Sequence, residues 1–328
     1  MSTASRARTT FFAHVEACRP DTLFYAGLVA LSGAVLSRPD APVHLLFLAW
    51  LVPTLAWVAS LYGGDYFDRE LDALTKPHRP VPSGRIRATT ARNTMVGLIA
   101  AGGAIAVLVN PATVLLAVLA TVFGIAYARF LKGRGLWGNV VRGVPTALTL
   151  LWGAMAVQPL PGVELLPLAV VFLVHDAGSN LLGALCDRDG DGRGGYETYP
   201  VRRGDDATVR ALTRFTAGWV VLAAVWPLLF PAAVASLLVY YGLLLVAVVL
   251  AGVSLLGVRR AGRPIPRAVG LRAHEVVVVE RLVLGTYLVA AAGRIGTAAL
   301  VGLPSVALTV LARRLMRSRY EPAPHPRA

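Results

Sequence analysis

The sequence contains few charged residues and almost no cysteine. Charged side chains make up 15% of its 328 residues, whereas hydrophobic side chains make up 56%, and the mean hydropathy is +0.62. Such a chain has too little polar surface to cover a soluble globule, and its repeated apolar runs have the length of membrane-spanning helices. The two cysteines, Cys18 and Cys186, are too few for a disulfide framework. We therefore expect an all-α integral membrane protein.

A cleavable signal peptide and a nucleic-acid-binding module are also missing. Residues 1–21 are polar and basic, with no small-residue cleavage site after a short apolar core, so we expect a retained cytoplasmic tail. The chain carries 32 Lys and Arg against 18 Asp and Glu. These cations lie between alternate apolar runs and not in a basic, aromatic-studded domain. We therefore expect the lipid bilayer as a partner, no nucleic acid and no obligatory protein partner.

The apolar runs predict one transmembrane domain over residues 22–312, followed by a basic C-terminal tail, 313–328. The runs lie at 22–36, 44–62, 94–109, 112–127, 140–157, 163–183, 216–230, 232–257 and 276–312. The last run is too long for one crossing, so we expect nine helices, or ten if a hairpin forms near Gly293. Nearly all basic loop residues lie in 63–93, 128–139, 186–215 and 258–275. By the positive-inside rule these loops face the cytoplasm from a plasma or inner membrane.

Three aspartates follow the second apolar run. Asp65, Asp68 and Asp72 are spaced by three and then four residues, which on a helix places their carboxylates on one face. Three like charges at the end of an apolar helix repel one another unless a hard cation lies between them. Carboxylate oxygens suit Mg²⁺, which is commonly shared with substrate phosphates. The spacing therefore predicts a magnesium site, with a solvated acidic loop as the alternative.

A basic, proline-rich loop comes next. Lys76 and Arg79 are cations of the kind that clamp phosphate oxygens, and Arg85 and Arg87 follow them. Prolines at 77, 80 and 82 end the helix and stiffen the loop. A phosphate group beside the metal is therefore the expected ligand.

A second acidic pair echoes the first. Asp187 and Asp191 are four residues apart after the sixth apolar run, and a Pro-Val turn and Gly204 follow, as a Pro-Val turn and a glycine follow Asp68 and Asp72. An EF-hand loop is the competing interpretation, but Thr198 stands where its bidentate glutamate would be. We therefore expect two pseudo-repeated, aspartate-rich motifs.

These stretches resemble the motifs of the UbiA superfamily of intramembrane prenyltransferases. Members carry Asn-Asp-x-x-Asp-x-x-x-Asp, then Lys-Pro-x-Arg-Pro-x-x-Ser-Gly, and later Asp-x-x-x-Asp. The matching residues here are 64–72, 76–84 and 187–191, with a further matching segment at 127–132 and 135–139. The resemblance covers roughly residues 20–260. In one departure, Gly64 stands where the family has an asparagine that binds metal, and glycine offers no side-chain oxygen.

The resemblance implies a UbiA-like bundle and a set of site residues. Asp68, Asp72, Asp187 and Asp191 would be catalytic and would hold Mg²⁺ together with Asp65. The residues implied to hold diphosphate are Lys76, Arg79, Tyr127, Lys132 and Arg142. For Arg142, a helix-end arginine that reaches the membrane interface is the alternative.

Polar residues inside or beside the apolar runs are candidates for a substrate cavity, because ionisable groups in a membrane are costly. Asn139 and Gly64 adjoin the motifs. Asn180 lies seven residues before Asp187, on the same helix face. His175 could line the cavity and accept a proton, and a mutually satisfied buried pair with Asp176 is the alternative. For Glu280 and Arg281 we expect a pair at the membrane interface.

The function that the resemblance implies is a Mg²⁺-dependent transfer of a prenyl group from a prenyl diphosphate to an aromatic or lipid-like, hydrophobic acceptor. An apolar bundle suits this chemistry because it keeps water from the allylic cation. A terpene cyclase on the same scaffold is one alternative, in which the prenyl chain captures its own cation. A membrane transporter is a more remote one, since repeats and intramembrane charges also suit a carrier.

Overall fold

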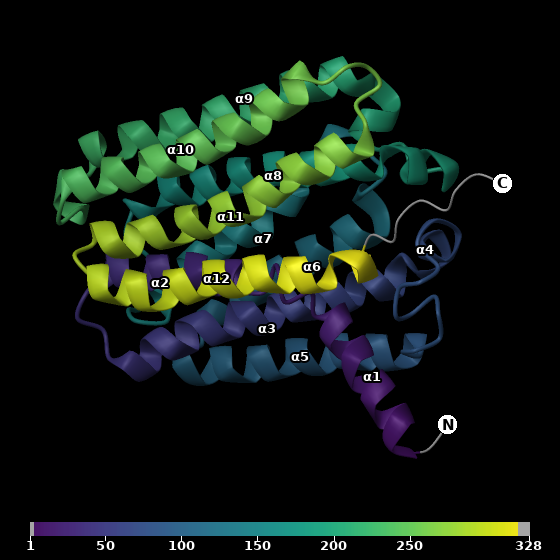
Figure 1. Ribbon diagram of the computed structural model, residues 1–328. Coiled ribbons are helices and arrows are strands. Elements are labelled where there is room, and N and C mark those ends of the chain that lie inside the picture. Colours follow the sequence, from purple (N-terminus) through teal and green to yellow (C-terminus); the bar gives the residue numbers. More distant parts are fainter. Residues whose placement is uncertain (1–2, 321–328) are drawn as a thin grey trace.

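The computed structural model describes residues 3–320, which form a bundle of long helices (Figure 1). The first is a separate helix, α1 (Thr3–Ala17), which projects obliquely from the bundle (Figure 1). The end of the predicted C-terminal tail, residues 321–328, lies outside the described part of the chain. The bundle helices are α2 (Tyr25–Ser37), α3 (Val43–Phe67), α5 (Ala88–Val109), α6 (Thr113–Ala126), α7 (Leu136–Met155), α8 (Leu165–Arg193), α9 (Tyr199–Leu229), α10 (Leu237–Arg260), α11 (Arg267–Ala291) and α12 (Ile295–Tyr320).

Three short elements complete the helical structure. The helix α4 (Arg69–Thr75) follows α3 at one end of the bundle, the right-hand end in Figure 1. A π-helical turn, η1 (Tyr127–Leu131), extends α6, and a 3-10 turn, η2 (Pro231–Ala233), precedes α10. The expected all-α fold is confirmed.

The last apolar run forms a hairpin of two helices. Helix α11 ends at Ala291 and α12 begins at Ile295, and between them Gly293 adopts a left-handed backbone with φ of 88°, which a glycine accepts without strain. Helix α12 then runs back along the bundle, and Arg313 Nε lies 3.2 Å from Asp21 Oδ2. The end of α12 therefore lies on the same side as both aspartate motifs.

Seven helices in the described part of the chain are long and apolar enough to cross a membrane: α3, α5, α6 with η1, α8, α9, α10 and α12. The shorter α2 is also apolar. Helices α7 and α11 carry polar residues such as Arg142 and Arg281 within their length. The number of crossings, nine or ten, stays a prediction, as does the duplicated origin of the two motifs.

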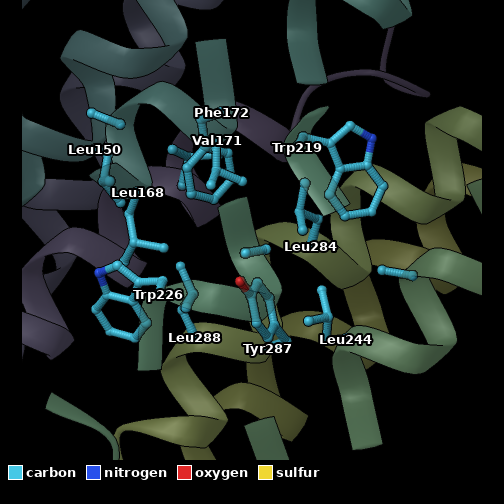
Figure 2. Close-up of a cluster of buried hydrophobic side chains, with 14 of the residues drawn as sticks. Leu150, Leu168, Val171, Phe172, Trp219, Trp226, Leu244, Leu284, Tyr287 and Leu288 are labelled. Carbon is cyan, nitrogen blue, oxygen red and sulfur yellow. The ribbon is translucent and has the colours of Figure 1, made fainter. Parts of the chain in front are cut away.

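The largest hydrophobic core lies among α2, α7, α8, α9, α10 and α11. Figure 2 shows its aromatic side chains Phe172, Trp219, Trp226 and Tyr287 among leucines. By contrast, α5 and α6 turn large apolar side chains outward: Leu108 is 85% exposed and Leu115 is 64% exposed. An apolar outer surface of this kind suits contact with lipid.

Glycines allow α7 to approach two neighbouring helices closely. A β-carbon at Gly153 would lie 1.8 Å from the carbonyl oxygen of Ala30 on α2, and one at Gly143 would lie 2.3 Å from that of Leu173 on α8. Small residues at such crossings let backbones meet, as is common in membrane bundles. Helix α7 is thereby fixed against α2 and α8, whose side chains line the cavity described next.

Candidate active site

A cavity of about 1050 Å³ lies inside the bundle and is lined mainly by residues of α2, α3, α5, α6, α7, α8 and α11. Its volume is at the upper end of the usual range for a small-molecule site. Apolar side chains line most of it, and both aspartate motifs contribute to one end. The sequence motifs, which are more than one hundred residues apart, therefore meet at one cavity.

The first motif lies where the chain bends between two helices. Asp68 links α3 to α4, and its backbone leaves the helical conformation with φ of −87° and ψ of 2°. Asp68 and Asp72 line the cavity. Asp65, predicted to share their face, does not: it is 2% exposed and pairs with Arg19 at 2.7 Å. Arg79 Nη1 lies 4.0 Å from Asp65 Oδ1 and 2.7 Å from Asp72 Oδ2, so Asp65 and Asp72 share one arginine.

The second motif lies on the last turns of α8. Asp187 and Asp191 are one turn apart and both line the cavity. The Nζ atom of Lys76 lies 2.9 and 2.8 Å from the two carboxylate oxygens of Asp187. Arg79 Nη1 lies 2.7 Å from Asp72 Oδ2. The basic loop after the first motif therefore reaches across to the second motif.

The π-helical turn supplies two further site residues. The backbone N–H of Lys132 donates to the carbonyl of Tyr127 at 2.9 Å, which closes the wider π turn. Such turns are frequent at functional sites. Lys132 Nζ lies 2.6 Å from Asp68 Oδ2, and the Tyr127 hydroxyl donates to Asn180 Oδ1 at 3.1 Å. All four side chains line the cavity.

The two lysines differ in how firmly they hold their protons. Burial disfavours the charged form of Lys132, but the Asp68 carboxylate, together with Tyr127 and Asp191, outweighs burial and raises the pKa of Lys132. Burial lowers the pKa of Lys76, and the Asp187 carboxylate offsets this only in part. Of the two lysines at this end of the cavity, Lys132 therefore holds its proton more strongly.

A second group of polar residues lies deeper in the bundle. Arg142 on α7 donates to Asp176 Oδ2 at 3.0 Å, and Thr146 donates to the same oxygen at 3.1 Å. Asp176 lies eleven residues before Asp187 on α8, which corresponds to about 16 Å along the helix. Arg142 thus has a partner inside the bundle and does not extend to the interface. Asn139 and Gly64 also line the cavity.

His175 lies away from this cavity. Its Nε2 atom lies 2.7 Å from Glu280 Oε2, and its Nδ1 atom lies 3.4 Å from the hydroxyl of Tyr25. His175 and Asp176 do not pair with each other, because adjacent residues point about 100° apart around a helix. Glu280 and Arg281 are 1% and 5% exposed, and the predicted pair between them does not form, because Glu280 contacts His175 and Arg281 contacts the rings of Tyr25 and Trp57.

Helix α11 contributes cavity residues that the sequence analysis missed. Arg267, His274 and Arg281 line the cavity and are spaced by seven residues, which places them on one helix face. That spacing was the available signal. The signal was missed because the predicted apolar run begins at residue 276, after Arg267 and His274, and because Arg281 was predicted to pair with Glu280 at the membrane interface.

The donor set of the two motifs fits Mg²⁺. It consists of carboxylate oxygens, and Asp68 Oδ1 is buried with no hydrogen-bond partner. Within residues 3–320, no three His, Cys, Asp or Glu side chains lie close enough together to hold one metal ion by themselves. Mg²⁺ tolerates such a set, since it is commonly held by one or two carboxylates together with waters and substrate phosphates.

Comparisons with known proteins agree with this geometry. The family model described as the UbiA prenyltransferase family matches residues 23–274. A digeranylgeranylglyceryl phosphate synthase of Methanopyrus kandleri is 34% identical over 221 residues, covering 66% of this chain and 78% of the relative. The corresponding synthase of Ignicoccus hospitalis is 30% identical over 220 residues, covering 64% and 71%.

Solved structures share the fold. A UbiA homolog from Archaeoglobus fulgidus, bound to DMAPP and Mg²⁺, has a TM-score of 0.66 at 14% sequence identity and covers 92% of this chain and 99% of its own. At this identity the likeness shows the fold alone. Taken with the match over residues 23–274, it agrees with the fold and enzyme class expected from the aspartate motifs. The chain belongs to the UbiA prenyltransferase family.

Proposed function

We propose that this prenyltransferase is Mg²⁺-dependent and transfers a prenyl group from a prenyl diphosphate to a lipid-like acceptor inside the membrane. One observation carries the proposal: carboxylates and cations from two distant motifs converge at one end of a large apolar cavity. The carboxylates can bind Mg²⁺ and the lysines and arginine can bind phosphate oxygens. A prenyl chain could extend from a diphosphate held there into the apolar part of the cavity.

The two motifs would share one diphosphate. Asp68, Asp72, Asp187 and Asp191 would hold Mg²⁺, which when bound stabilises the charge of the departing diphosphate. The cations that would contact diphosphate oxygens directly are Lys76, Arg79 and Lys132, with Tyr127 as a hydroxyl donor. Each of these cations lies beside a motif carboxylate, within reach of the same end of the cavity. For Asp65 we propose a supporting role, since it holds Arg19 and does not line the cavity.

The chain's residues would drive the transfer by position and exclusion of water. The bond between the prenyl C1 and the diphosphate oxygen breaks, and its electron pair leaves with the diphosphate. A nucleophilic atom of the acceptor forms the new bond to C1, and its proton passes to the released diphosphate. The apolar walls contributed by α5 and α6 keep water from the allylic cation.

The related proteins support this donor and this class of acceptor. The Archaeoglobus fulgidus homolog was solved with DMAPP or GPP and Mg²⁺. The curated relatives bear the name of a synthase of a glyceryl phosphate lipid. We infer a glycerophosphate-type lipid acceptor in preference to an aromatic ring. A terpene cyclase is disfavoured because Arg281, which forms no ion pair within residues 3–320, lies in the cavity wall and would oppose a carbocation migrating along its own chain.

We also propose that the aspartate motifs face the cytoplasm of a cell membrane, where soluble diphosphates and Mg²⁺ are available. The support is the concentration of basic residues in the loops at that end.

The first test removes one carboxylate from each motif. Asp68→Ala and Asp187→Ala should each lower diphosphate release with Mg²⁺ and geranyl diphosphate by at least about 100-fold, because each removes charge stabilisation from the leaving group. Asp206→Ala is the control, since Asp206 is 71% exposed and pairs only with Arg263 at the surface. Thermal unfolding in detergent would show that all variants are folded. Near-normal release by either motif variant would contradict the shared site.

The second test concerns the glycine at the family's asparagine position. Apart from the adjoining residues and the backbone of its own helix, no atom lies within 4 Å of where a β-carbon at Gly64 would stand, so a longer side chain fits there. Gly64→Asn should increase the Mg²⁺ affinity measured by titrating binding of a non-hydrolysable geranyl thiolodiphosphate, and only while Asp68 is intact. Gly64→Ala is the matched control, because it gives the helix gain of about 0.5–1 kcal/mol without an oxygen ligand. Equal shifts in both variants would show that Gly64 does not stand at a metal-ligand position.

The third test concerns orientation. Cysteines are introduced one at a time at Ser83, beside the first motif, and at Leu160, at the opposite end of the bundle, in a chain carrying Cys18→Ser and Cys186→Ser. Ser83 and Leu160 are exposed, so both positions should react with a membrane-impermeant maleimide. In intact cells only the cysteine at 160 should be labelled, and in inverted vesicles only the cysteine at 83. The reverse pattern would overturn the orientation.

A further inference from the structure

Arg281 is a buried cation that forms no ion pair within the part of the chain that the structure describes, although Asp176 and Asp21 are near enough to act on its charge. It lies within α11 and is 5% exposed. Its contacts are with aromatic rings: the guanidinium carbon lies 5.0 Å from the ring centre of Tyr25 and 5.8 Å from that of Trp57. Its Nε atom is buried without a hydrogen-bond partner. Charged groups inside a membrane bundle are costly, and they mark functional positions.

The neighbouring residues add a second cation to the same place. The ring of Trp57 also contacts Arg142, whose guanidinium carbon lies 5.0 Å from the ring centre. Arg142 is paired with Asp176, whereas Arg281 is not, so two arginines face one carboxylate. All four residues, Arg142, Arg281, Trp57 and Asp176, line the cavity. Among these four residues two guanidinium groups have one carboxylate between them, and the nearby buried carboxylate of Glu280 is bonded to His175.

The group of Arg142 and Arg281 is separate from the diphosphate end of the cavity. Lys76, Arg79 and Lys132 are all paired with carboxylates of the two motifs. Asp176 lies about 16 Å along α8 from Asp187, and Trp57 precedes Asp68 on α3 by the same number of residues. The arginine and lysine side chains extend from these two levels into the same cavity, so anions at both groups could be held with the acceptor hydroxyl, two carbons from its phosphate, close to the prenyl C1.

We propose that Arg281, supported by Arg142, binds the phosphate-ester head group of the acceptor lipid. A guanidinium presents a planar fork of donors that matches phosphate oxygens, and aromatic contacts hold it in place while its polar edge stays available. This inference rests on the proposed transfer to a lipid acceptor and makes the acceptor class specific. A phosphate oxygen of the bound head group would also accept a hydrogen bond from Nε of Arg281, which has no hydrogen-bond partner otherwise.

The experiment measures binding of two probes to the full-length protein in detergent. A short-chain 1-O-alkyl glycerol phosphate tests the acceptor subsite, and geranyl thiolodiphosphate with Mg²⁺ tests the donor subsite. Arg281→Gln should weaken binding of the alkyl glycerol phosphate by about 10-fold or more, as expected for loss of a charge-assisted pair. The donor probe should lose far less affinity. Arg260→Gln, which removes an exposed cation from the end of α10, should change neither affinity.

Further arms separate the ligand classes and guard against misfolding. The unaltered protein should bind the alkyl glycerol phosphate more tightly than the neutral alkyl glycerol, inorganic phosphate or 4-hydroxybenzoate, and Arg281→Lys should recover part of the lost affinity. The proposal is overturned if the neutral lipid or the aromatic acid binds as well as the phosphate lipid, or if Arg260→Gln and Arg281→Gln weaken binding equally. If the donor probe itself does not bind the unaltered protein, the proposed function fails instead.

Discussion

The compensation of buried charge organises this protein. An unpaired carboxylate or cation inside a low-dielectric bundle is strongly destabilising, and removing one partner of a buried pair costs about 3–5 kcal/mol. Around the motifs three aspartates each have a cation from another segment, Arg19 for Asp65, Arg79 for Asp72 and Lys132 for Asp68, whereas Asp191, 4% exposed, forms no ion pair within residues 3–320. These pairs tie the N-terminal segment, the proline-rich loop and the end of α6 to one place. The fold and the site are therefore specified by the same contacts.

The same pairs place chemically opposite groups side by side at the cavity end. Lys76, which follows the first motif, lies against Asp187 of the second. A site for a metal and a diphosphate needs ligands of both signs, because the carboxylates face the cation and the lysines and arginines face the anion. The glycines at 153 and 143 let α7 pack closely against α2 and α8. This packing fixes the position of Arg142, which pairs with Asp176 deeper in the cavity.

The sequence was sufficient for those features that depend on local spacing. The apolar runs predicted the helical bundle, and the two acidic motifs and the segment from Tyr127 to Lys132 predicted one end of the cavity. Local spacing failed where a partner comes from a distant segment. Asp65 pairs with Arg19 from the N-terminal segment, and His175 contacts Glu280 on α11 in place of its neighbour Asp176. Arg281 was predicted to pair with Glu280 because nothing near it in sequence shows that Tyr25 and Trp57 cover its side chain.

The central claim is that both motifs hold one metal–diphosphate group, and metal binding tests it most directly. Electron paramagnetic resonance of Mn²⁺, used in place of Mg²⁺, would count the bound ions in the presence of geranyl thiolodiphosphate. The account predicts that Asp72→Asn and Asp191→Asn each lower donor-dependent Mn²⁺ binding markedly while the protein stays folded, although the two residues lie on different helices. Unchanged Mn²⁺ binding after either substitution would contradict a site shared between the motifs.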